Sequence, residues 1–295
     1  MNRYFVIDIG TNSARLLSAE ITETGVRTLS RKVITCRTGE NVDKTGLLGE
    51  EAVARTLSAI DEFMEIIAEE GSSANVFCYA TSAVRDSSNR EDFKKRLRDR
   101  FGLDLMILSG AEEALYGFIG AVPGGTGALL DIGGGSTEFI YGKDGIITYS
   151  KSFQLGCVRS LDRFGSEQVT YDMACDCFGG IAAPSSIEVT GVGGTITSFA
   201  AMDQKLVPYD SSRVHGYLLT RKAVNALTEL LWKTPVESRL FIPGLHPKRA
   251  DIIGYGGAIL SAFMDRFNID SIRVSECDAM EGLLMIKSGA ISAPN

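Results

Sequence analysis

The sequence predicts an α/β protein built from two similar domains that face each other across a cleft. A chain of 295 residues exceeds the usual size of a single domain, so two domains are expected. Both halves follow roughly the order β-β-β-α-β-α-β-α, with extra helices in the second half. Each half also opens with an apolar strand that ends in an aspartate and turns on glycine, at Asp8 and at Asp131. The two turns match in register, which indicates a repeated domain.

The first half reads as three strands followed by alternating helices and strands. Apolar residues at three- and four-residue steps from Glu50 to Glu70 indicate an amphipathic helix. Two Ser-x-x-Glu segments, which begin at Ser88 and Ser109, have the spacing of capping boxes that start helices. The expected elements are strands 4–9, 14–21, 25–36, 75–80 and 103–108 and helices 50–70, 92–101 and 113–122.

The second half begins after a Pro- and Gly-rich segment. Residues 123–127 read PGGTG, which predicts a domain boundary between 1–123 and 124–295. The last helix is expected to pack back on the first domain. The expected elements are strands 128–133, 136–142, 145–154, 187–191 and 271–275, helices 220–233, 248–267 and 278–288, and a mixed region up to residue 186.

Composition and charge exclude several classes of function. A net charge of −7 argues against broad nucleic-acid binding, so no DNA partner is expected. No apolar run approaches the length of a membrane span, and the N-terminus lacks the pattern of a secretory signal. The cysteines are scattered, several within apolar runs, which indicates reduced thiols and a cytoplasmic protein. The two histidines, His215 and His246, are too few for most zinc-hydrolase sites.

Two hairpin turns, one opening each half, carry the clearest chemical signal. In both, an apolar strand ends in an aspartate, turns on glycine and continues through hydroxyl side chains into another apolar run. Glycine lets backbone N–H groups converge on an anion, and hydroxyl groups add further donors. The predicted phosphate-binding residues are Thr11, Asn12, Ser13 and Arg15 in the first turn and Gly133, Gly134, Gly135, Ser136 and Thr137 in the second.

The two turns differ in one charged position. Aligning Asp8 with Asp131 places Arg15 on Glu138, so one turn offers a cation where the other offers a carboxylate. The second turn is not a dinucleotide-binding fingerprint, because no glycine lies three residues after Gly135. The residues that follow it also read as a strand rather than a helix.

Two further segments have the chemistry of phosphate contacts. The strand–turn–helix at 191–195 places Gly193, Gly194 and Thr195 at a helix N-terminus, where anions bind. Arg85 follows a buried strand, at the kind of loop where α/β proteins place ligands, and its guanidinium suits bidentate phosphate contact. An ordinary surface arginine is the alternative for Arg85.

Three acids are candidates for catalysis or metal binding. Glu112 is expected to cap its own helix, whereas Glu113 points elsewhere from the first turn of a helix at the domain crossing; a surface acid favoured by the helix dipole is the alternative. Glu138 lies on the same strand face as Ser136, where it would repel phosphate unless it bound a metal or held a water; a solvated strand acid is the alternative. Asp131 ends an apolar strand and is costly to bury unless it is paired or metal-bound.

Short motifs spread along the whole chain carry a resemblance to a known family. They are DIGTNSARL (8–16), ATSAVR (80–85), SGAEEA (109–114), DIGGGSTE (131–138), LGCVR (155–159), GVGGT (191–195), RADII (249–253) and EGLL (281–284). In this order they resemble the exopolyphosphatase/guanosine pentaphosphate phosphatase (Ppx/GppA) family. That family lies within the ribonuclease H-like superfamily of actin, sugar kinases and heat-shock ATPases.

The resemblance implies two actin-like domains and a hydrolase assisted by Mg²⁺ or Mn²⁺. Its substrates would be inorganic polyphosphate, with short chains expected, or guanosine penta- or tetraphosphate, from which terminal orthophosphate is released by an in-line water. The resemblance assigns the catalytic role to Glu113 and Glu138, with Asp131, Glu138 and Asp8 at the metal and Arg85 on the phosphate. It also implies a homodimer. The chain would be a short form of the family, without the C-terminal HD-type domain, and Ala111 stands where the family usually has an acid.

Two other functions remain open from the sequence. A kinase of the same superfamily would share both hairpins and use ATP, but it would need an acceptor pocket and an aspartate base. A non-catalytic sensor of polyphosphate or nucleotide would use the cleft only for binding, and it would gain nothing from three acids. Release of free phosphate without an acceptor distinguishes the hydrolase from both.

Overall fold

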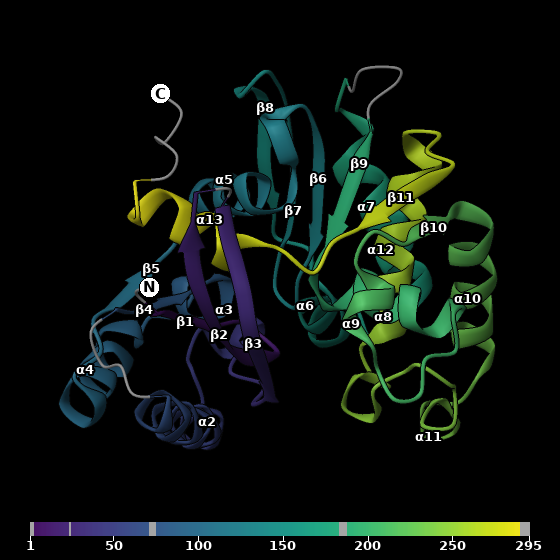
Figure 1. The fold of residues 1–295 in the computed structure, drawn as a ribbon. Coiled ribbons are helices and arrows are strands. Elements are labelled where there is room, and N and C mark those ends of the chain that lie inside the picture. The colour runs from purple at the N-terminus through teal and green to yellow at the C-terminus, as the bar shows by residue number, and fades with distance from the viewer. Residues whose placement is uncertain (1–2, 24, 71–74, 183–187, 290–295) are drawn as a thin grey trace.

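The first sheet of the protein is formed by the N-terminal third of the chain. The computed structural model describes residues 3–23, 25–70, 75–182 and 188–289 (Figure 1). The strands of the first sheet are β1 (Arg3–Ile9), β2 (Ser13–Thr22), β3 (Gly25–Thr35), β4 (Val76–Ala80) and β5 (Leu105–Ile107). They lie in the order β3-β2-β1-β4-β5, with β1, β2 and β3 antiparallel and β4 and β5 parallel to β1.

The second sheet repeats this topology. Its strands are β6 (Gly127–Ile132), β7 (Thr137–Lys143), β8 (Ile146–Phe153), β9 (Val189–Val192), β10 (Leu218–Thr220) and β11 (Ser271–Val274). Their order is β10-β11-β9-β6-β7-β8, so β8-β7-β6-β9-β11 corresponds strand for strand to the first sheet. The predicted α/β fold class, with the same strand order in both halves of the chain, is confirmed.

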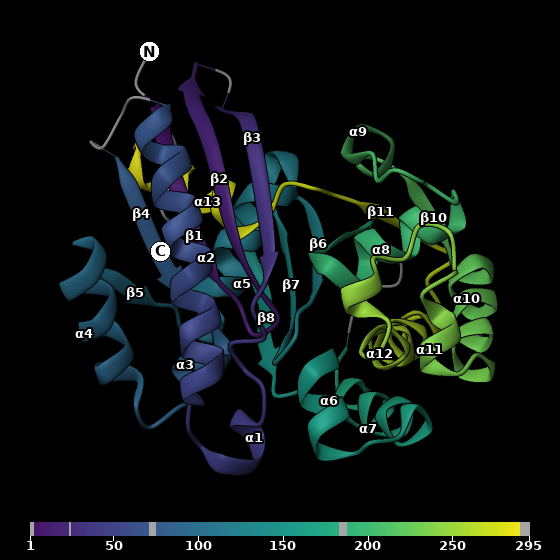
Figure 2. The same ribbon diagram turned by 90° about the horizontal axis from the view of Figure 1, so that it is seen from below.

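Helices cover both sheets (Figures 1 and 2). Figure 2 shows α2 and α4 beside the first sheet and α8, α10 and α12 grouped beside the second. The described helices are α1 (Val42–Thr45), α2 (Glu50–Glu69), α3 (Ser82–Arg85), α4 (Arg90–Phe101), α5 (Gly110–Ala121), α6 (Cys157–Arg163), α7 (Glu167–Gly179), α8 (Gly193–Asp203), α9 (Ser211–Val214), α10 (Arg221–Lys233), α11 (Val236–Arg239), α12 (Ile253–Arg266) and α13 (Ala279–Lys287). Short 3₁₀ turns lie at Pro123–Gly125 and Pro247–Arg249. None of the helices in this part of the chain is long and apolar enough to cross a membrane.

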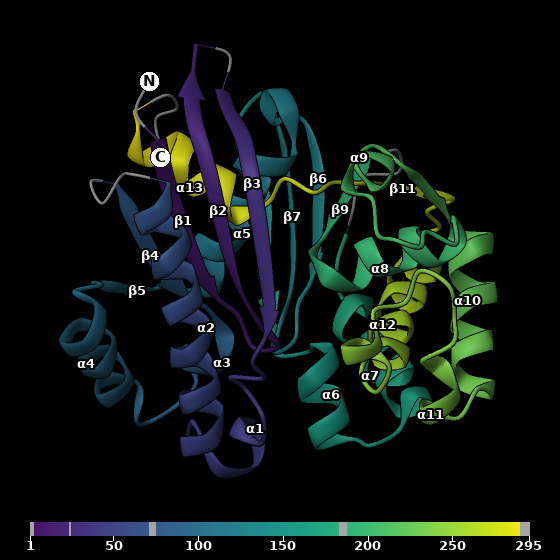
Figure 3. The same ribbon diagram turned by 60° about the horizontal axis from the view of Figure 1, so that its bottom comes forward.

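Two helices connect the sheets, because each packs on the sheet formed by the other half of the chain. Helix α5 buries Phe118 in an apolar cluster with Leu129 and Ile140 of the second sheet. Helix α13 buries Leu283 in a cluster with Val6 of the first sheet. The two helices also pack on each other, as Figure 3 shows. The domain boundary at 123/124 stays a prediction, and this exchange of helices makes the two halves one packed unit.

The close approach of α5 and α13 depends on glycine. A Cβ atom on Gly282 would lie 1.8 Å from the carbonyl oxygen of Tyr116, and one on Gly120 would lie 2.0 Å from the carbonyl oxygen of Asp278. Both distances are far inside van der Waals contact, so these positions require glycine. The segment 278–281 is thereby held against the first sheet.

Helix starts show where local patterns were sufficient and where they were not. The capping box at Ser109 is confirmed: its Oγ accepts a hydrogen bond from the Glu112 N–H at 3.2 Å. The capping box at Ser88 is wrong, because α4 begins after Asn89 and the Ser88 hydroxyl donates to the carbonyl of Gly46. The loop 46–48 binds both residues through contacts that the sequence pattern does not contain.

Other expected boundaries also shift. Helix 248–267 begins only at Ile253, since Pro247–Arg249 forms a 3₁₀ turn capped by the side chain of His246. The mixed region contains the helices α6 and α7, and β10 has no counterpart among the expected strands. The first residue of the strand expected at 187–191 lies outside the described residues.

Candidate active site

The turns between β1 and β2 and between β6 and β7 are built alike. In the first, the N–H of Gly10 donates to the carbonyl of Ser13 at 3.1 Å, and in the second Gly133 donates to Ser136 at 3.0 Å. The N–H groups of the residues between them have no acceptor among the described residues. Each turn therefore presents backbone donors that can bind an anion.

The strand register explains the charge difference between the turns. Asp8 lies opposite Arg15 across β1 and β2, and Asp131 lies opposite Glu138 across β6 and β7. The alignment of the repeats predicted from the sequence is thus confirmed. The first pair is an ion pair, with Arg15 Nε 2.7 Å from the carboxylate of Asp8. The second pair sets two carboxylates directly opposite each other, which is unfavourable unless a proton or cation lies between them.

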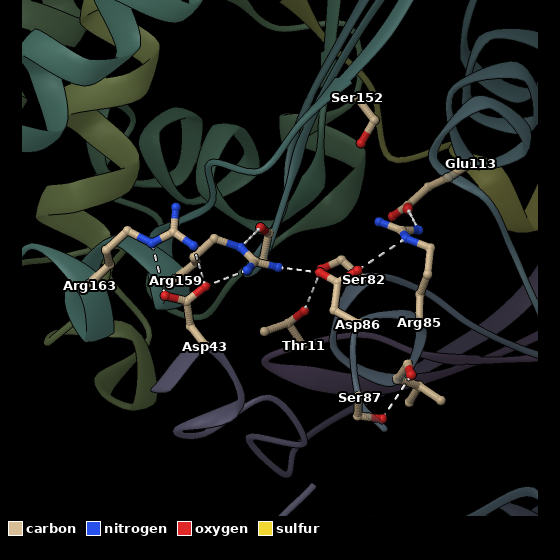
Figure 4. A network of polar contacts seen from close by, with 12 residues as sticks. Thr11, Asp43, Ser82, Arg85, Asp86, Ser87, Glu113, Ser152, Arg159 and Arg163 are labelled. Carbon is tan, nitrogen blue, oxygen red and sulfur yellow. Dashed lines mark hydrogen bonds and ion pairs between the residues drawn. The ribbon is translucent and has the colours of Figure 1, made fainter. Parts of the chain in front are cut away.

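The two turns contact each other. A Cβ atom on Gly135 would lie 2.1 Å from Ser82 Oγ and 2.7 Å from Thr11 Oγ1, and one on Gly134 would lie 2.9 Å from Thr11 Cβ. The Thr11 and Ser82 hydroxyls hydrogen-bond at 3.1 Å (Figure 4). Only glycine allows the second turn to come this close to the first.

A cavity of about 100 Å³ lies between the turns. Most of the predicted site residues line it: Asp8, Thr11, Asn12, Ser13, Arg15, Glu113, Asp131, Gly133, Gly134, Gly135, Ser136, Gly193 and Gly194. A larger cavity of about 700 Å³ has Arg15, Gly193, Gly194 and Arg249 in common with it and extends along β2 and β3 to the segments 206–209 and 240–247. The two cavities are therefore adjacent and share these wall residues.

Four predicted residues do not line the small cavity. Thr137 is buried and donates its hydroxyl to the carbonyl of Leu155 at 2.6 Å, on the opposite strand face from Ser136. Thr195 is also buried. Arg85 and Glu138 do not line it either, although Arg85 binds Glu113, which does.

Arg85 binds the carboxylate of Glu113 instead of lying free. Its Nη1 donates to Glu113 Oε2 at 3.0 Å and to the carbonyl of Leu108 at 2.9 Å. Its Nη2 is buried and has no partner among the described residues. The guanidinium therefore orients Glu113 and retains one donor for a further oxygen.

Burial and mutual repulsion act on the acids of the site. Burial raises the pKa of Glu113, the charge of Arg85 lowers it, and repulsion from Asp8 raises it further. The net result is a pKa of about 7. Burial and the charge of Glu113 also raise the pKa of Asp131 to about 7. Glu138 is 1% exposed, and burial followed by repulsion from Glu113 and Asp131 raises its pKa well above the usual range. Groups poised in this way gather at functional sites.

The sequence interpretation missed several residues of this site. Arg249 lines both cavities, lies against the backbone of Gly194, and has no ion-pair partner in the part of the chain that the structure describes. Asp278 forms an ion pair with Arg15 across 263 residues of sequence. Burial acts to raise the pKa of Asp278, but Arg15 and Arg31 outweigh it and lower the pKa. Arg249 stands in the RADII motif, which was the one signal available.

Comparisons with known proteins place the chain in a family. The model of the Ppx/GppA phosphatase family matches residues 17–289. The chain belongs to the Ppx/GppA phosphatase family. The resemblance stated from the sequence is confirmed, and so is the prediction of a phosphatase-type hydrolase.

Relatives within the Ppx/GppA family cover nearly the whole chain. Exopolyphosphatase 2 of Mycobacterium tuberculosis is 32% identical over 98% of this chain and 99% of its own. A bifunctional 3-dehydroquinate synthase/phosphatase of Fusobacterium nucleatum is 33% identical over 95% of this chain, which spans 46% of that relative. A guanosine-5'-triphosphate,3'-diphosphate pyrophosphatase of Vibrio atlanticus is 27% identical, and the match covers 95% of this chain and 58% of the relative. The structure of an exopolyphosphatase from Cytophaga hutchinsonii superposes with a TM-score of 0.87 at 27% identity, covering 100% of both chains.

The acids of this Ppx/GppA site fit a divalent cation by their chemistry. Glu138 Oε2 and Asp8 Oδ1 are buried carboxylate oxygens without a hydrogen-bond partner among the described residues. Glu138 Oε1 accepts from Ser152 Oγ at 2.6 Å. No cluster of three or more His, Cys, Asp or Glu side chains in the described ranges is compact enough to hold a metal by itself. Buried carboxylate oxygens such as these fit Mg²⁺, which commonly binds through one or two carboxylates and completes its shell with phosphate oxygens and water.

The raised pKa of Glu113 predicts a pH-dependent difference in stability between wild type and Glu113→Gln. Because the pKa rises from 4.5 to about 7 on folding, the unfolded chain binds fewer protons than the folded protein in that window. The Glu113 contribution to the unfolding free energy therefore falls as pH rises from about 4.5 to about 7. Gln cannot ionise, so the variant does not lose this contribution. The melting temperature of Glu113→Gln minus that of wild type should therefore be several degrees larger at about pH 8 than at about pH 5. Calorimetry without metal or phosphate measures this gain, and an equal difference at both pH values would contradict it.

Proposed function

We propose that this Ppx/GppA protein releases terminal orthophosphate from inorganic polyphosphate or from guanosine pentaphosphate by metal-assisted, in-line attack of water. One observation carries the proposal: two facing turns with free N–H donors enclose a cavity of about 100 Å³, with Glu113 in its wall. A site of this size suits a single phosphoryl group. Phosphoryl transfer asks mainly for positioning and charge stabilisation, which these donors supply.

The substrate would extend from the small cavity into the larger one. Past Arg15 and Arg249, the wall of the larger cavity carries the cation of Lys32 and the aromatic rings of Tyr209 and Phe241. Cations suit further phosphate groups, and the rings suit a nucleoside. Short polyphosphate chains are proposed as the inorganic substrate, because a cavity of about 700 Å³ holds a limited number of phosphate units. Relatives named exopolyphosphatase and relatives named for the guanosine nucleotide support both substrate classes.

Glu113 is proposed as the group that orients and deprotonates the attacking water. With a pKa of about 7 it can accept a proton at neutral pH, whereas an ordinary glutamate is too weak a base. Arg85 fixes the direction of its carboxylate through the 3.0 Å contact. Glu113 lies in the first turn of α5, and its side chain lines the cavity.

Asp131 and Glu138 are proposed to hold Mg²⁺ or Mn²⁺, with Asp8 close by. The two acids face each other across the strand pair, and a cation would relieve their repulsion. When bound, the ion would neutralise charge on the phosphate oxygens. Arg15 would hold Asp8 in place through their ion pair, which uses Asp8 Oδ2. Asp8 also lines the cavity.

The test is release of phosphate from tripolyphosphate, long-chain polyphosphate and guanosine pentaphosphate, side by side with Mg²⁺. Release from at least one substrate without any acceptor is expected, with short chains cut faster than long ones. A chelator should abolish release, and added Mg²⁺ should restore it. Absence of phosphate release from all three substrates would overturn the proposal. Transfer of phosphate from ATP to an acceptor would then indicate a kinase, and binding without any transfer would indicate a sensor.

A further inference from the structure

The carbonyl side of the second phosphate turn is bound by the start of α6. The N–H of Cys157 donates to the carbonyl of Gly133 at 3.1 Å, and the N–H of Val158 donates to that of Gly134 at 2.8 Å. The side chain of Arg159 completes the set, with Nε 2.6 Å from the carbonyl of Gly135. All three glycine carbonyls are thus engaged on the α6 side, while the N–H groups of Gly134 and Gly135 have no acceptor among the described residues.

The same guanidinium reaches across to the first sheet. Arg159 forms ion pairs with Asp43 in α1 and with Asp86, the residue after α3 (Figure 4). It is 9% exposed, so a charge from one half of the chain is buried between carboxylates from the other half. A buried ion pair is weak support for stability, because desolvation offsets much of the attraction. Its best-attested use is to fix one arrangement among several.

The segment that Arg159 binds is the one that positions the other site residues. Ser82, at the start of α3, bonds the Thr11 hydroxyl and lies against Gly135, and Arg85, at the end of α3, holds Glu113. Arg159 forms its ion pair with Asp86 at the end of this segment. The contact therefore joins three parts of the site: the second phosphate turn, the first phosphate turn and the glutamate.

We infer that Arg159 is a positioning residue, which holds the second phosphate turn in its anion-binding conformation and fixes it against the first. It acts through the carbonyl of Gly135 and through Asp86, without touching substrate. Arg suits this role and Lys does not, because the planar guanidinium reaches three acceptors in different directions. The kinetic part of the inference rests on the proposed function, whereas its effect on anion binding does not.

Arg163 offers a matched control, since it lies in the same helix and also binds Asp43. Its nitrogens are 2.6 and 2.9 Å from the Asp43 carboxylate, but it has no contact with the turn. Arg159→Gln, Arg159→Lys and Arg163→Gln should be compared by calorimetric binding of tripolyphosphate in a Glu113→Gln background and by hydrogen exchange of the peptide 131–138. Kinetic constants for phosphate release are measured in the same variants with Glu113 restored.

Arg159→Gln is expected to weaken tripolyphosphate binding and raise KM by roughly 10- to 100-fold, with faster exchange of the turn, because small misplacements of site groups have effects of this size. The pH profile of kcat should stay unchanged, since Glu113 keeps its own partner. Arg159→Lys should fall between wild type and Gln, and Arg163→Gln should stay within about twofold of wild type. If Arg159→Gln does not fold, Asp86→Asn, which removes one of the two ion pairs between Arg159 and the first half of the chain, should still weaken binding.

Binding and exchange in Arg159→Gln equal to those in wild type or in Arg163→Gln would overturn the inference. A wild-type protein that binds tripolyphosphate but releases no phosphate would overturn the proposed hydrolysis instead. The binding and exchange measurements would then still decide the role of Arg159.

Discussion

Glu113→Gln is expected to lower kcat for phosphate release by about 10³-fold while KM changes only a few-fold, because the amide cannot accept a proton from water. The Gln side chain keeps the size of the glutamate and can still face Arg85, whose Nη1 lies 3.0 Å from Glu113 Oε2. The phosphate-binding turns are untouched, so substrate should still bind. Steady-state release of phosphate from tripolyphosphate with Mg²⁺, together with calorimetric binding, measures both quantities.

Glu112→Gln is the matched control for this prediction. Glu112 is adjacent in sequence and exposed, and its carboxylate accepts from the Ser109 N–H at 2.8 Å as part of the capping box. Gln can replace Glu in a capping box, so α5 should still begin at the same residue in Glu112→Gln. Activity of Glu112→Gln should stay within about twofold of wild type. A Glu113→Gln variant that is equally active would exclude Glu113 as the base.

Gly135→Ala is expected to lower kcat/KM by about 10²-fold, mainly through a higher KM, because the new methyl group would push the two phosphate turns apart. The Cβ atom would lie 2.1 Å from Ser82 Oγ and 2.7 Å from Thr11 Oγ1, so these two hydroxyl groups, which hydrogen-bond to each other, must move before it fits. The backbone at Gly135 is not in the left-handed region, so the effect comes from lack of space and not from strain. Kinetics of phosphate release and tripolyphosphate binding test it.

Two further variants separate this crowding from a general effect of the substitution. Gly179→Ala makes the same change at the end of α7, where a Cβ atom would have no neighbour within 4 Å, and should leave kcat/KM within about twofold of wild type. In a Ser82→Ala background the nearest clashing atom of Gly135→Ala is gone, so the loss in kcat/KM should be smaller than in wild type. An equal loss in both backgrounds would show that crowding against Ser82 is not the cause.

The two glycine turns, between β1 and β2 and between β6 and β7, could be predicted from the sequence because their backbone geometry is local. An aspartate, a glycine and a serine within six residues are enough to specify the strand end, the tight turn and the start of the next strand. The alignment of Asp8 with Asp131 follows from the same short segments, and the strand register confirms it. The capping box at Ser109 was predictable for the same reason, since donor and acceptor are three residues apart.

A local pattern is not enough where a side chain binds a partner that is distant in the sequence. Ser88 has a glutamate at capping-box spacing, but its hydroxyl binds Gly46, 42 residues away. Thr137 stands in the glycine-rich turn, but strand alternation turns its hydroxyl toward Leu155. In each case the donor finds a better acceptor in the folded chain than the one that the pattern offers.

The sequence by itself determined the family and the repeated α/β topology, because both depend on short contiguous segments; which residues bind phosphate stays a prediction. The tertiary structure alone decided how the charges of the site are paired. Arg15 finds Asp278 across 263 residues, and Arg159 finds Asp43 across 116. Such pairs leave no periodicity or spacing in the chain, because they exist only where the two sheets meet. Electrostatic energy depends on distance and burial, and both are properties of the folded protein.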